Sequence, residues 1–306
     1  MKRKYKVSGN YFTYINAIIM CIMMLIAIYP LYYAVINSFN DGTNTTNFGM
    51  VIFWPRVFSI ESWKTVLNDV SVVRAIMLTV SRTAIVTFLQ IFFTSMFSYA
   101  FSRAYLRGKK AYTILGFTSM YISGGIIASF LLLSKMRLYN TYWVYIAPFL
   151  FGGFYNVMIY ISNFRGIPAE LFESAKLDGA SEYRIYFTIV LPLSKAVIAA
   201  LSVFTIVGIW NDYTTSLFYT SSDELQTLQY YIVKLVRNQS ALEQLVKDAS
   251  SVSTEVFDLL YTNKGAVSSR TLELAAMTIA AIPMIIMYPF AQKFFTKGVM
   301  IGSIKG

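Results

Sequence analysis

The most informative stretch of this chain, residues 164–193, reads FRGIPAELFESAKLDGASEYRIYFTIVLPL. It is polar and is interrupted by glycine and proline, yet it lies between two long apolar runs. Pro168 suits the first position of a helix, which needs no backbone N–H donor, and Gly179 can end that helix in a left-handed conformation. The sequence therefore predicts one short helix between Pro168 and Gly179.

A second helix is expected after Ser181, with Glu182 in its first turn and Pro192 near its end. On the first helix, one side collects apolar side chains and acidic groups lie beside it. The apolar members are Ile167, Leu171, Phe172 and Ala175, and the acidic ones are Glu170, Glu173 and Asp178. Such a side could insert into an apolar groove rimmed by basic groups. The alternative is an ordinary hairpin that lies on a membrane surface.

Composition places these helices in a membrane protein. The 306 residues are 56% hydrophobic and only 13% charged, about half the charged content of a typical soluble domain. There is no histidine, and the single cysteine, Cys21, lies in an apolar run, which disfavours zinc, haem and iron–sulfur sites and an internal disulfide. The net charge of +11 comes from Lys and Arg that flank apolar runs, so nucleic acid is not an expected partner.

Six stretches approach the roughly 20 apolar residues that a helix needs to cross about 30 Å of hydrocarbon. They lie near residues 14–37, 74–100, 111–134, 139–163, 194–218 and 273–295. The first follows a basic cluster, as a signal peptide would, but it is too long and lacks a cleavage site, so we expect it to remain. The predicted fold is an all-α polytopic membrane protein with six transmembrane helices.

The orientation follows from the basic residues, because cytoplasmic loops retain an excess of Lys and Arg. One side would hold Lys2, Arg3, Lys4, Lys6, Arg103, Arg107, Lys109, Lys110, Arg165, Lys176, Arg184, Lys195, Lys293, Lys297 and Lys305. The other side has only Arg56, Lys64, Lys135 and Arg137 in its shorter loops. Both termini and the 164–193 loop are therefore expected in the cytoplasm. The expected segments are a cytoplasmic N-terminus (1–13), the first helix (14–37), an extracytoplasmic loop (38–73), a core (74–295) and a cytoplasmic tail (296–306).

An extracytoplasmic insertion, residues 219–272, carries apolar side chains at three- and four-residue spacing, which predicts an amphipathic helix. These are Leu225, Leu228, Tyr231, Ile232 and Leu235. The helix either packs on the bundle or contacts a partner or substrate. The glycine pairs Gly124-Gly125 and Gly152-Gly153 permit close helix packing, which we expect, or a helix break that lines a cavity.

Polar groups within the spans are costly in a membrane and usually face a cavity or a partner helix. Trp210, Asn211, Asp212 and Tyr213 combine an aromatic face with amide and carboxylate acceptors, which suits a neutral sugar. The alternative is an outer helix end capped by polar residues. For Arg82 we expect a structural or gating role rather than substrate contact, either facing the cavity or paired with a neighbour such as Gln90.

The loop pattern resembles the EAA loop of permease subunits in binding-protein-dependent ABC importers. Glu173-Ser174-Ala175 precedes Gly179 by three residues, and Ile189, Leu191 and Pro192 match the following I-x-L-P. Ser174 replaces the first alanine with another small residue. The resemblance extends to the six spans, the Trp210–Tyr213 segment and the Lys297-Gly298-Val299-Met300-Ile301-Gly302 ending. Together these features are similar to the carbohydrate-uptake branch, whose members have the fold of type I importers.

The resemblance implies a sugar or oligosaccharide permease in a bacterial plasma membrane, surrounded by lipid. Its partners would be a second related permease, two cytoplasmic ATPase subunits and an extracytoplasmic solute-binding lipoprotein. The chain has no G-x-x-x-x-G-K-[ST] loop, so it would bind no cofactor and catalyse nothing, and ATP and Mg would belong to the ATPases. The implied ATPase-coupling residues are Pro168, Leu171, Phe172, Glu173, Ser174, Ala175, Asp178, Gly179 and Pro192. Lys297 and Gly298 are the implied ATPase contacts of the tail, which could alternatively contact anionic lipid.

Other functions remain as alternatives to a sugar permease. An ABC permease for a non-sugar solute would share the same loop. An ion-coupled secondary transporter or channel needs intramembrane carboxylates, and apart from Asp212 the predicted spans offer almost none. A membrane enzyme or scaffold is disfavoured by the missing histidines and paired carboxylates.

Overall fold

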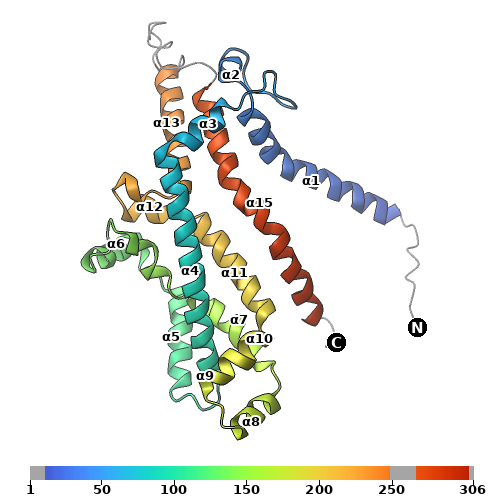
Figure 1. Cartoon of the computed structure of the whole chain (residues 1–306), viewed down its shortest axis with the longest axis vertical. Helices are drawn as coiled ribbons and strands as arrows, with labels where there is room; N and C mark the ends of the chain where they lie inside the picture. The colour runs from blue at the N-terminus through green and yellow to red at the C-terminus, as the bar shows by residue number, and fades with distance from the viewer. Residues whose placement is uncertain (1–10, 249–266, 303–306) are drawn as a thin grey trace. The chain divides into compact units, whose positions relative to one another are not determined.

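The computed structural model describes residues 11–248 and 267–302, which are almost entirely helical (Figure 1). Within these residues the only β-type pairing is an isolated bridge between Asn40 and Phe58. The chain divides into two compact units. The first holds the residues up to Asp69 together with Lys234–Ala281, and the second holds Val70–Val233 and the residues from Ile282 on. The all-α prediction is confirmed.

The first unit opens with α1, Tyr11–Ser38, whose side chains are apolar on all sides and largely exposed. The predicted loop 38–73 is partly helical, because it contains α2, Gly42–Phe48, and α3, Glu61–Asn68. The Asp41 side chain caps α2 by accepting a 3.0 Å hydrogen bond from the Asn44 N–H. The Phe39 ring stacks on both Phe58 and Trp63, at centroid distances of 5.5 and 4.9 Å. These aromatic side chains therefore pack on one another.

Two long helices run through both units. The first, α13, spans Leu228–Asp248 and confirms the helix expected in the insertion from Leu228 on, while Leu225 ends a preceding 3₁₀ turn, η4, Asp223–Leu225. The second, α15, spans Ser269–Gly302, so it continues through the sixth expected span into the expected tail. Within the first unit, Ser62 Oγ on α3 donates a 2.9 Å hydrogen bond to Thr271 Oγ1 on α15.

The second unit is built around α4, Val70–Ser102, which packs against α7, Gly153–Arg165, and α11, Lys195–Trp210 (Figure 1). Its 33 residues give a length of roughly 50 Å. The remaining elements, in chain order, are α5 Lys109–Tyr121, α6 Gly125–Lys135, η1 Tyr142–Tyr145, η2 Ala147–Phe149, α8 Ala169–Leu177, α9 Glu182–Ile185, η3 Tyr186–Val190, α10 Leu191–Leu193 and α12 Thr214–Tyr219.

In the part of the chain that the structure describes, three helices are long and apolar enough to cross a membrane: α1, α4 and residues 269–289 of α15. The number rises to six when each of three bent helix pairs counts as one span. These pairs bend by 115° between α5 and α6, by 46° between residues 142–149 and α7, and by 80° between residues 182–193 and α11. The expected third span, 111–134, and fourth span, 139–163, are thus each broken. In the expected fifth span, 194–218, α11 ends at Trp210 and the short helix α12 follows from Thr214.

Glycine explains two of these breaks. Gly125 and Gly153 have φ of +72° and +71°, a conformation that side chains with a Cβ rarely adopt, and a Cβ at either position would meet no other atom within 4 Å. The close packing that we expected at the glycine pairs is found at Gly152, where a Cβ would lie only 2.8 Å from Asn156 Nδ2. The Gly152 N–H also donates a 2.8 Å hydrogen bond to Thr94 Oγ1 on α4.

Candidate functional site

The helix predicted within the 164–193 loop forms as α8. Its N-cap is Pro168, with φ −53° and ψ 135°, so the helix proper begins one residue later than expected. At the other end, Gly179 has φ +75°. The Gly179 N–H bonds to the Lys176 carbonyl at 3.0 Å, and the Ala180 N–H bonds to the Ala175 carbonyl at 2.9 Å. This is the Schellman pattern, so Gly179 ends α8 as predicted.

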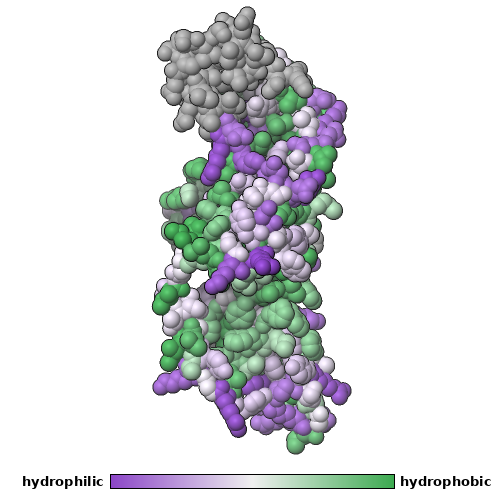
Figure 2. All heavy atoms as spheres, turned by 90° about the vertical axis from the view of Figure 1, so that its left-hand side faces the viewer, coloured by the Kyte–Doolittle hydropathy of each residue, from purple (hydrophilic) through white to green (hydrophobic). Residues whose placement is uncertain are grey.

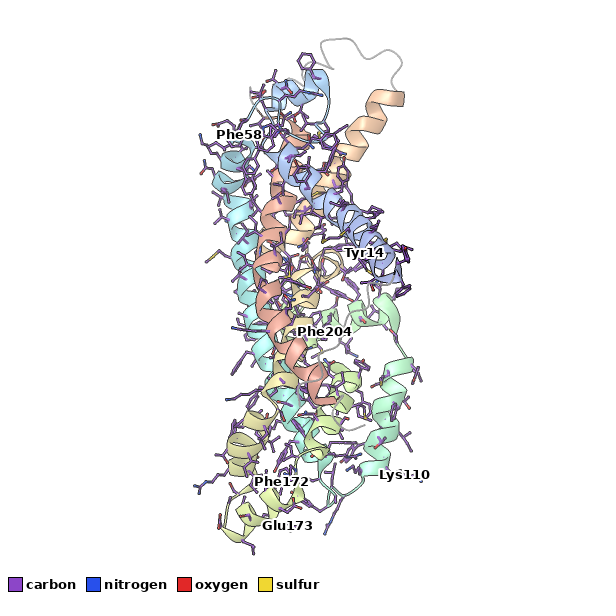
Figure 3. All side chains as sticks on the ribbon, turned by 90° about the vertical axis from the view of Figure 1, so that its right-hand side faces the viewer. Tyr14, Phe58, Lys110, Phe172, Glu173 and Phe204 are labelled. Atoms are coloured by element: carbon purple, nitrogen blue, oxygen red, sulfur yellow. The ribbon has the colours of Figure 1, made fainter. Side chains whose placement is uncertain are left out.

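The apolar side expected for α8 divides between the chain's own core and the solvent. Ile167, Phe172 and Ala175 pack on a buried cluster formed by Tyr99, Tyr160, Phe164, Ile185, Tyr186, Val190 and Leu201. Leu171 points outward with 42% of its surface exposed, and Leu177, which was not singled out, is 89% exposed. Glu173, Ser174 and Asp178 are also exposed. Figure 3 labels Phe172 and Glu173, neighbours on α8 that belong to these two sets.

The second predicted helix begins where expected, since Ser181 Oγ accepts a 3.3 Å hydrogen bond from the Arg184 N–H. It runs through α9, a π-helical turn (η3) and α10, which contains Pro192. The chain then turns by 80° into α11. The backbone path from α8 to the α11 span therefore contains two changes of direction, at Gly179 and at Ser194.

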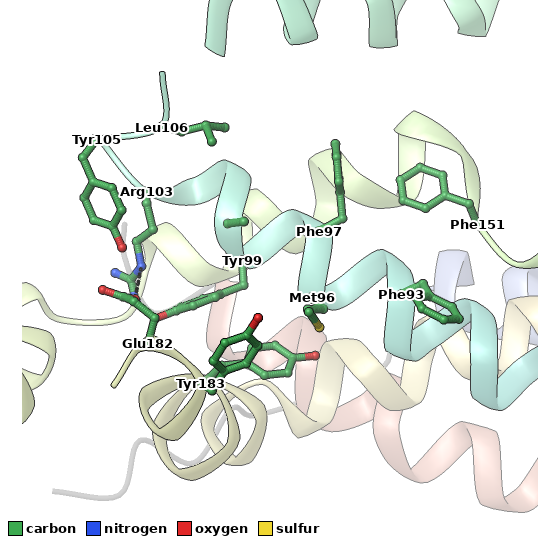
Figure 4. A pocket seen from close by; sticks show the side chains of 12 residues that line it. Phe93, Met96, Phe97, Tyr99, Arg103, Tyr105, Leu106, Phe151, Glu182 and Tyr183 are labelled. Atoms are coloured by element: carbon green, nitrogen blue, oxygen red, sulfur yellow. Dashed lines mark hydrogen bonds and ion pairs between the residues drawn. The ribbon is translucent and has the colours of Figure 1, made fainter. Parts of the chain in front are cut away.

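A polar cluster, here called the Glu182 clasp, ties this loop to the end of α4 (Figure 4). It consists of Tyr99, Arg103 and Glu182, which Figure 4 labels, together with Lys176, which that view does not draw. The Glu182 carboxylate accepts a 2.5 Å hydrogen bond from the Tyr99 hydroxyl and lies 3.1 Å from Lys176 Nζ and 3.8 Å from Arg103 Nε. Sequence reasoning assigned Glu182 only to a first helical turn, because its partners on α4 are 83 residues away for Tyr99 and no local pattern records them.

The clasp borders a cavity of about 560 Å³ with largely apolar walls. Phe93, Met96 and Phe97 of α4 line one side, and Phe151 lines another (Figure 4).

Arg82 and Asp212, both singled out in the sequence, form an ion pair. Arg82 is fully buried, and its guanidinium also lies 4.6 Å from the Tyr145 ring centroid and 5.2 Å from that of Phe149. Arg82 Nη1 donates to the Asp212 backbone carbonyl at 3.3 Å. The suggested pairing of Arg82 with Gln90 is wrong, because Arg82 pairs with Asp212, whereas the side-chain oxygen Gln90 Oε1 accepts a 2.8 Å hydrogen bond from Thr205 Oγ1.

The other suggested sugar-path residues lie at the break that follows α11. Trp210, only 4% exposed, is part of the core. Asn211 and Tyr213 are exposed, and Asn211 Nδ2 bonds to the Val207 carbonyl one turn back at 2.9 Å. Asp212 accepts hydrogen bonds from the Thr214 hydroxyl at 2.6 Å and from the Thr215 N–H at 3.1 Å. The structure thus joins Asp212 to Arg82 and leaves Asn211 and Tyr213 at the surface of the break.

The suggested tail residues Lys297 and Gly298 lie in the last part of α15. The Lys297 side chain and residues 303–306 lie outside the described part of the structure.

Different elements lie beside the two ends of α4. Near its first turn, Arg74 Nη1 lies 3.6 Å from a Glu224 carboxylate oxygen in η4. Just past its last residue, Arg103 contacts α8 through the Phe172 ring at 3.9 Å. Figure 2 shows an apolar stretch above the hydrophilic end formed by α8 and α9, and Figure 3 shows Lys110 near that same end. At roughly 50 Å, α4 is longer than the roughly 30 Å of a hydrocarbon core.

Comparisons with known proteins agree with this architecture. Residues 71–301 match the family model described as "Binding-protein-dependent transport system inner membrane component". Protein LplC of Bacillus subtilis (strain 168) is 32% identical over 300 residues, covering 98% of this chain and 96% of that protein. The polygalacturonan/rhamnogalacturonan transport system permease protein YtcP of the same strain is 30% identical over 282 residues, covering 92% and 94%.

A solved structure is also similar. It is the crystal structure of a bacterial ABC transporter involved in the import of the acidic polysaccharide alginate. One chain of it superimposes with a TM-score of 0.82 at 25% identity, covering 96% of this chain and 100% of that one. The present chain therefore belongs to the family of binding-protein-dependent transport system inner membrane components, as an ABC permease of the sugar and oligosaccharide branch.

Proposed function

We propose that this chain forms half of the translocation path of an ATP-driven importer for a sugar or oligosaccharide, and that α8 is its contact with a cytoplasmic ATPase. The observation that carries the proposal is the exposed part of α8, held at the hydrophilic end of a helix long enough to cross the membrane. Its outward members are Leu171, Glu173, Ser174, Leu177 and Asp178. Apolar and acidic groups alternate there, which suits a groove with basic edges.

The remaining predicted coupling residues fit the same role indirectly. Pro168 and Gly179 fix the two ends of α8, whereas Phe172 and Ala175 seat it on the chain's own core. Pro192 lies in α10, directly before the bend into α11. A displacement of α8 by a docked ATPase would therefore be transmitted to the packed core on which α8 lies.

The partners in this proposal are a second related permease, two ATPase subunits and an extracytoplasmic solute-binding lipoprotein. The family description supports a binding protein. The ATPases hold ATP and Mg, and this chain binds no cofactor. Coupling must be reciprocal: if ATP-driven closure favours the outward-facing permease, loaded binding protein must favour ATPase closure by the same factor. The chain resides in the bacterial plasma membrane with both termini and α8 in the cytoplasm.

For the sugar path we propose the break after α11, where Asn211 and Tyr213 are exposed. Broken helices in transporters frequently form substrate sites, because irregular backbone is tolerated only beside protein or a water-filled cavity. Asp212 takes part through its pair with Arg82, which fixes the geometry of the break. The substrate is an oligosaccharide, and the acidic polysaccharides named for YtcP and for the alginate transporter are a reason to test acidic as well as neutral ones.

The test is reconstitution of the purified assembly in vesicles with its binding protein. We expect ATPase subunits to co-purify and sugar-loaded binding protein to stimulate hydrolysis and uptake, with acidic and neutral oligosaccharides compared. Glu173→Lys should abolish both activities while the chain still inserts, because the reversed charge opposes docking. Uptake driven by an ion gradient with the lone chain would contradict the proposal and favour a secondary transporter. If only a non-sugar solute stimulates ATP hydrolysis and uptake, the chain is still an ABC permease, but its substrate is not a sugar.

A further inference from the structure

The Glu182 clasp joins three separate segments of the second unit. Glu182 begins α9, Lys176 lies in the last turn of α8, and Tyr99 and Arg103 lie at the end of α4 and just beyond it. The carboxylate bonds the Tyr99 hydroxyl at 2.5 Å and pairs with Lys176 Nζ at 3.1 Å. One side chain therefore connects both helices of the loop to the membrane-length helix.

Arg103 reinforces this connection from the α4 side. Its guanidinium donates a 2.6 Å hydrogen bond to the Tyr99 hydroxyl and stacks over two rings, at 4.3 Å from the Tyr99 centroid and 3.9 Å from the Phe172 centroid. Phe172 belongs to α8, so Arg103 contacts α8 directly and Glu182 at the same time. Only 15% of the Arg103 side chain is exposed, which limits screening of its charge by water.

The Glu182 carboxylate is charged at neutral pH. Burial by itself would raise the pKa of Glu182, but hydrogen bonds from Tyr99, Tyr105 and Lys176 outweigh burial and lower the pKa to about 2. Two cations thus share one ionised carboxylate. An ionic cluster of this kind, with an aromatic hydroxyl in its centre, has a more fixed geometry than an isolated surface ion pair.

We propose that Glu182 is a positioning residue that makes α4 follow the movement of α8. The inference rests on the proposed function and extends it, because it names the connection through which a docked ATPase would reach the membrane core. The direct backbone route from α8 passes the Gly179 turn and the 80° bend at Ser194, and each can absorb displacement. The clasp bypasses both.

The route continues along α4 without interruption. Arg82 lies on the same continuous helix as Tyr99, and it pairs with Asp212 at the break after α11. A shift of α4 along its axis would therefore act on the break that we propose as part of the sugar path. Coupling between Glu182 and Arg103 along this route would appear as an interaction energy between variants of the two residues.

The experiment is a double-mutant cycle in the complete reconstituted assembly. The variants are Glu182→Gln, Arg103→Met and their combination, and the measured quantity is the ratio of ATP hydrolysis with loaded binding protein to that without. We expect each single variant to lower this ratio about fivefold or more, with unchanged basal hydrolysis and assembly yield. The double variant should be no worse than either single one, because both remove the same connection. Glu182→Asp, which keeps the charge, should retain most of the stimulation.

The matched control is Glu61→Gln, which removes a carboxylate from an exposed 2.7 Å pair with Lys64 on α3 and should leave the ratio unchanged. If Glu182→Gln keeps the wild-type ratio of stimulated to basal hydrolysis, the proposal is wrong. It is also wrong if the fold-losses of the two single variants multiply in the double variant, because the two residues would then act independently. If Glu182→Gln fails to assemble, Tyr99→Phe removes a single hydroxyl, and loss of assembly there too would show a merely structural role. A wild-type assembly without any sugar-stimulated hydrolysis would instead contradict the proposed function.

Discussion

Arg82 and Asp212 form a buried ion pair, in which the Arg82 side chain is fully buried and the Asp212 side chain is 14% exposed. A fully buried guanidinium is costly unless its charge is paired, and here Asp212 supplies a carboxylate to Nη2 and a backbone carbonyl to Nη1, whereas Arg82 Nε has no hydrogen-bond partner among the described residues. Thr215 Oγ1 accepts a further hydrogen bond from Arg82 at 3.4 Å. The pair consequently joins α4 to the break after α11.

Removing Asp212 should therefore destabilise the folded chain. In Asp212→Ala the Arg82 charge stays buried without its partner, a change that typically costs about 3–5 kcal/mol. We expect a strongly lowered thermal midpoint and a low yield of monodisperse protein in detergent. Asn211→Ala, an exposed neighbour, should change stability by less than about 0.5 kcal/mol.

A paired replacement separates structure from substrate contact. Arg82→Met combined with Asp212→Leu removes both charges, so it should recover much of the lost stability. If Asp212→Ala keeps the wild-type thermal midpoint and loses only sugar uptake, Asp212 contacts substrate and the structural account is wrong.

The sequence identified Arg82 and Asp212 as charged residues that are costly to place within a membrane span, but it could not predict that they pair with each other. The two are 130 residues apart, and neither hydropathy nor helical spacing carries information over that distance. Gln90 was named because it lies on the same expected helix, which is the only neighbourhood that a periodicity argument can describe. The Glu182 clasp was missed for the same reason.

Among the helical elements, local signals predicted α8 well and the membrane spans only in part. Pro168 and Gly179 act through their own backbone conformations, so the ends of α8 could be read from two residues. Apolar runs predicted six spans, but a hydropathy window averages over about 20 residues and does not detect a bend within it. The bends occur at Gly125 and Gly153. Glycine pairs are also expected where helices pack closely, so the sequence alone could not distinguish a bend from close packing.

The C-terminal end of α8 offers a prediction at this scale. Proline has φ fixed near −65° and no N–H, so Gly179→Pro can neither adopt +75° nor bond to the Lys176 carbonyl. We expect the spans to insert normally while sugar uptake and binding-protein-stimulated hydrolysis are lost. Asparagine tolerates the left-handed region, so Gly179→Asn should cost about 1 kcal/mol and keep both activities. Wild-type uptake in Gly179→Pro would mean that the end of α8 does not position it for coupling.

At the scale of the whole molecule, the ends of α4 define two surfaces that a membrane must separate. Glu224 lies beside Arg74 near the first turn, and α8 lies beside Arg103 at the last. Arg74 and Arg103 are separated by roughly 44 Å of helix, and Lys110 lies near the same end as α8 (Figure 3). Because cytoplasmic segments carry an excess of Lys and Arg, we expect α8 on the cytoplasmic side and Glu224 outside.

Cysteine labelling in intact cells tests this orientation, because Cys21 is the only cysteine and Cys21→Ser gives a background without thiols. In that background we expect Glu224→Cys to react with a membrane-impermeant maleimide added outside, and Ser174→Cys to react only after the membrane is permeabilised. Both side chains are exposed, so each thiol is accessible once the reagent reaches its side. The Cys21→Ser chain alone should stay unlabelled. Labelling of Ser174→Cys in sealed cells would place α8 outside, where no cytoplasmic ATPase could reach it, and the importer assignment of its coupling role would fail.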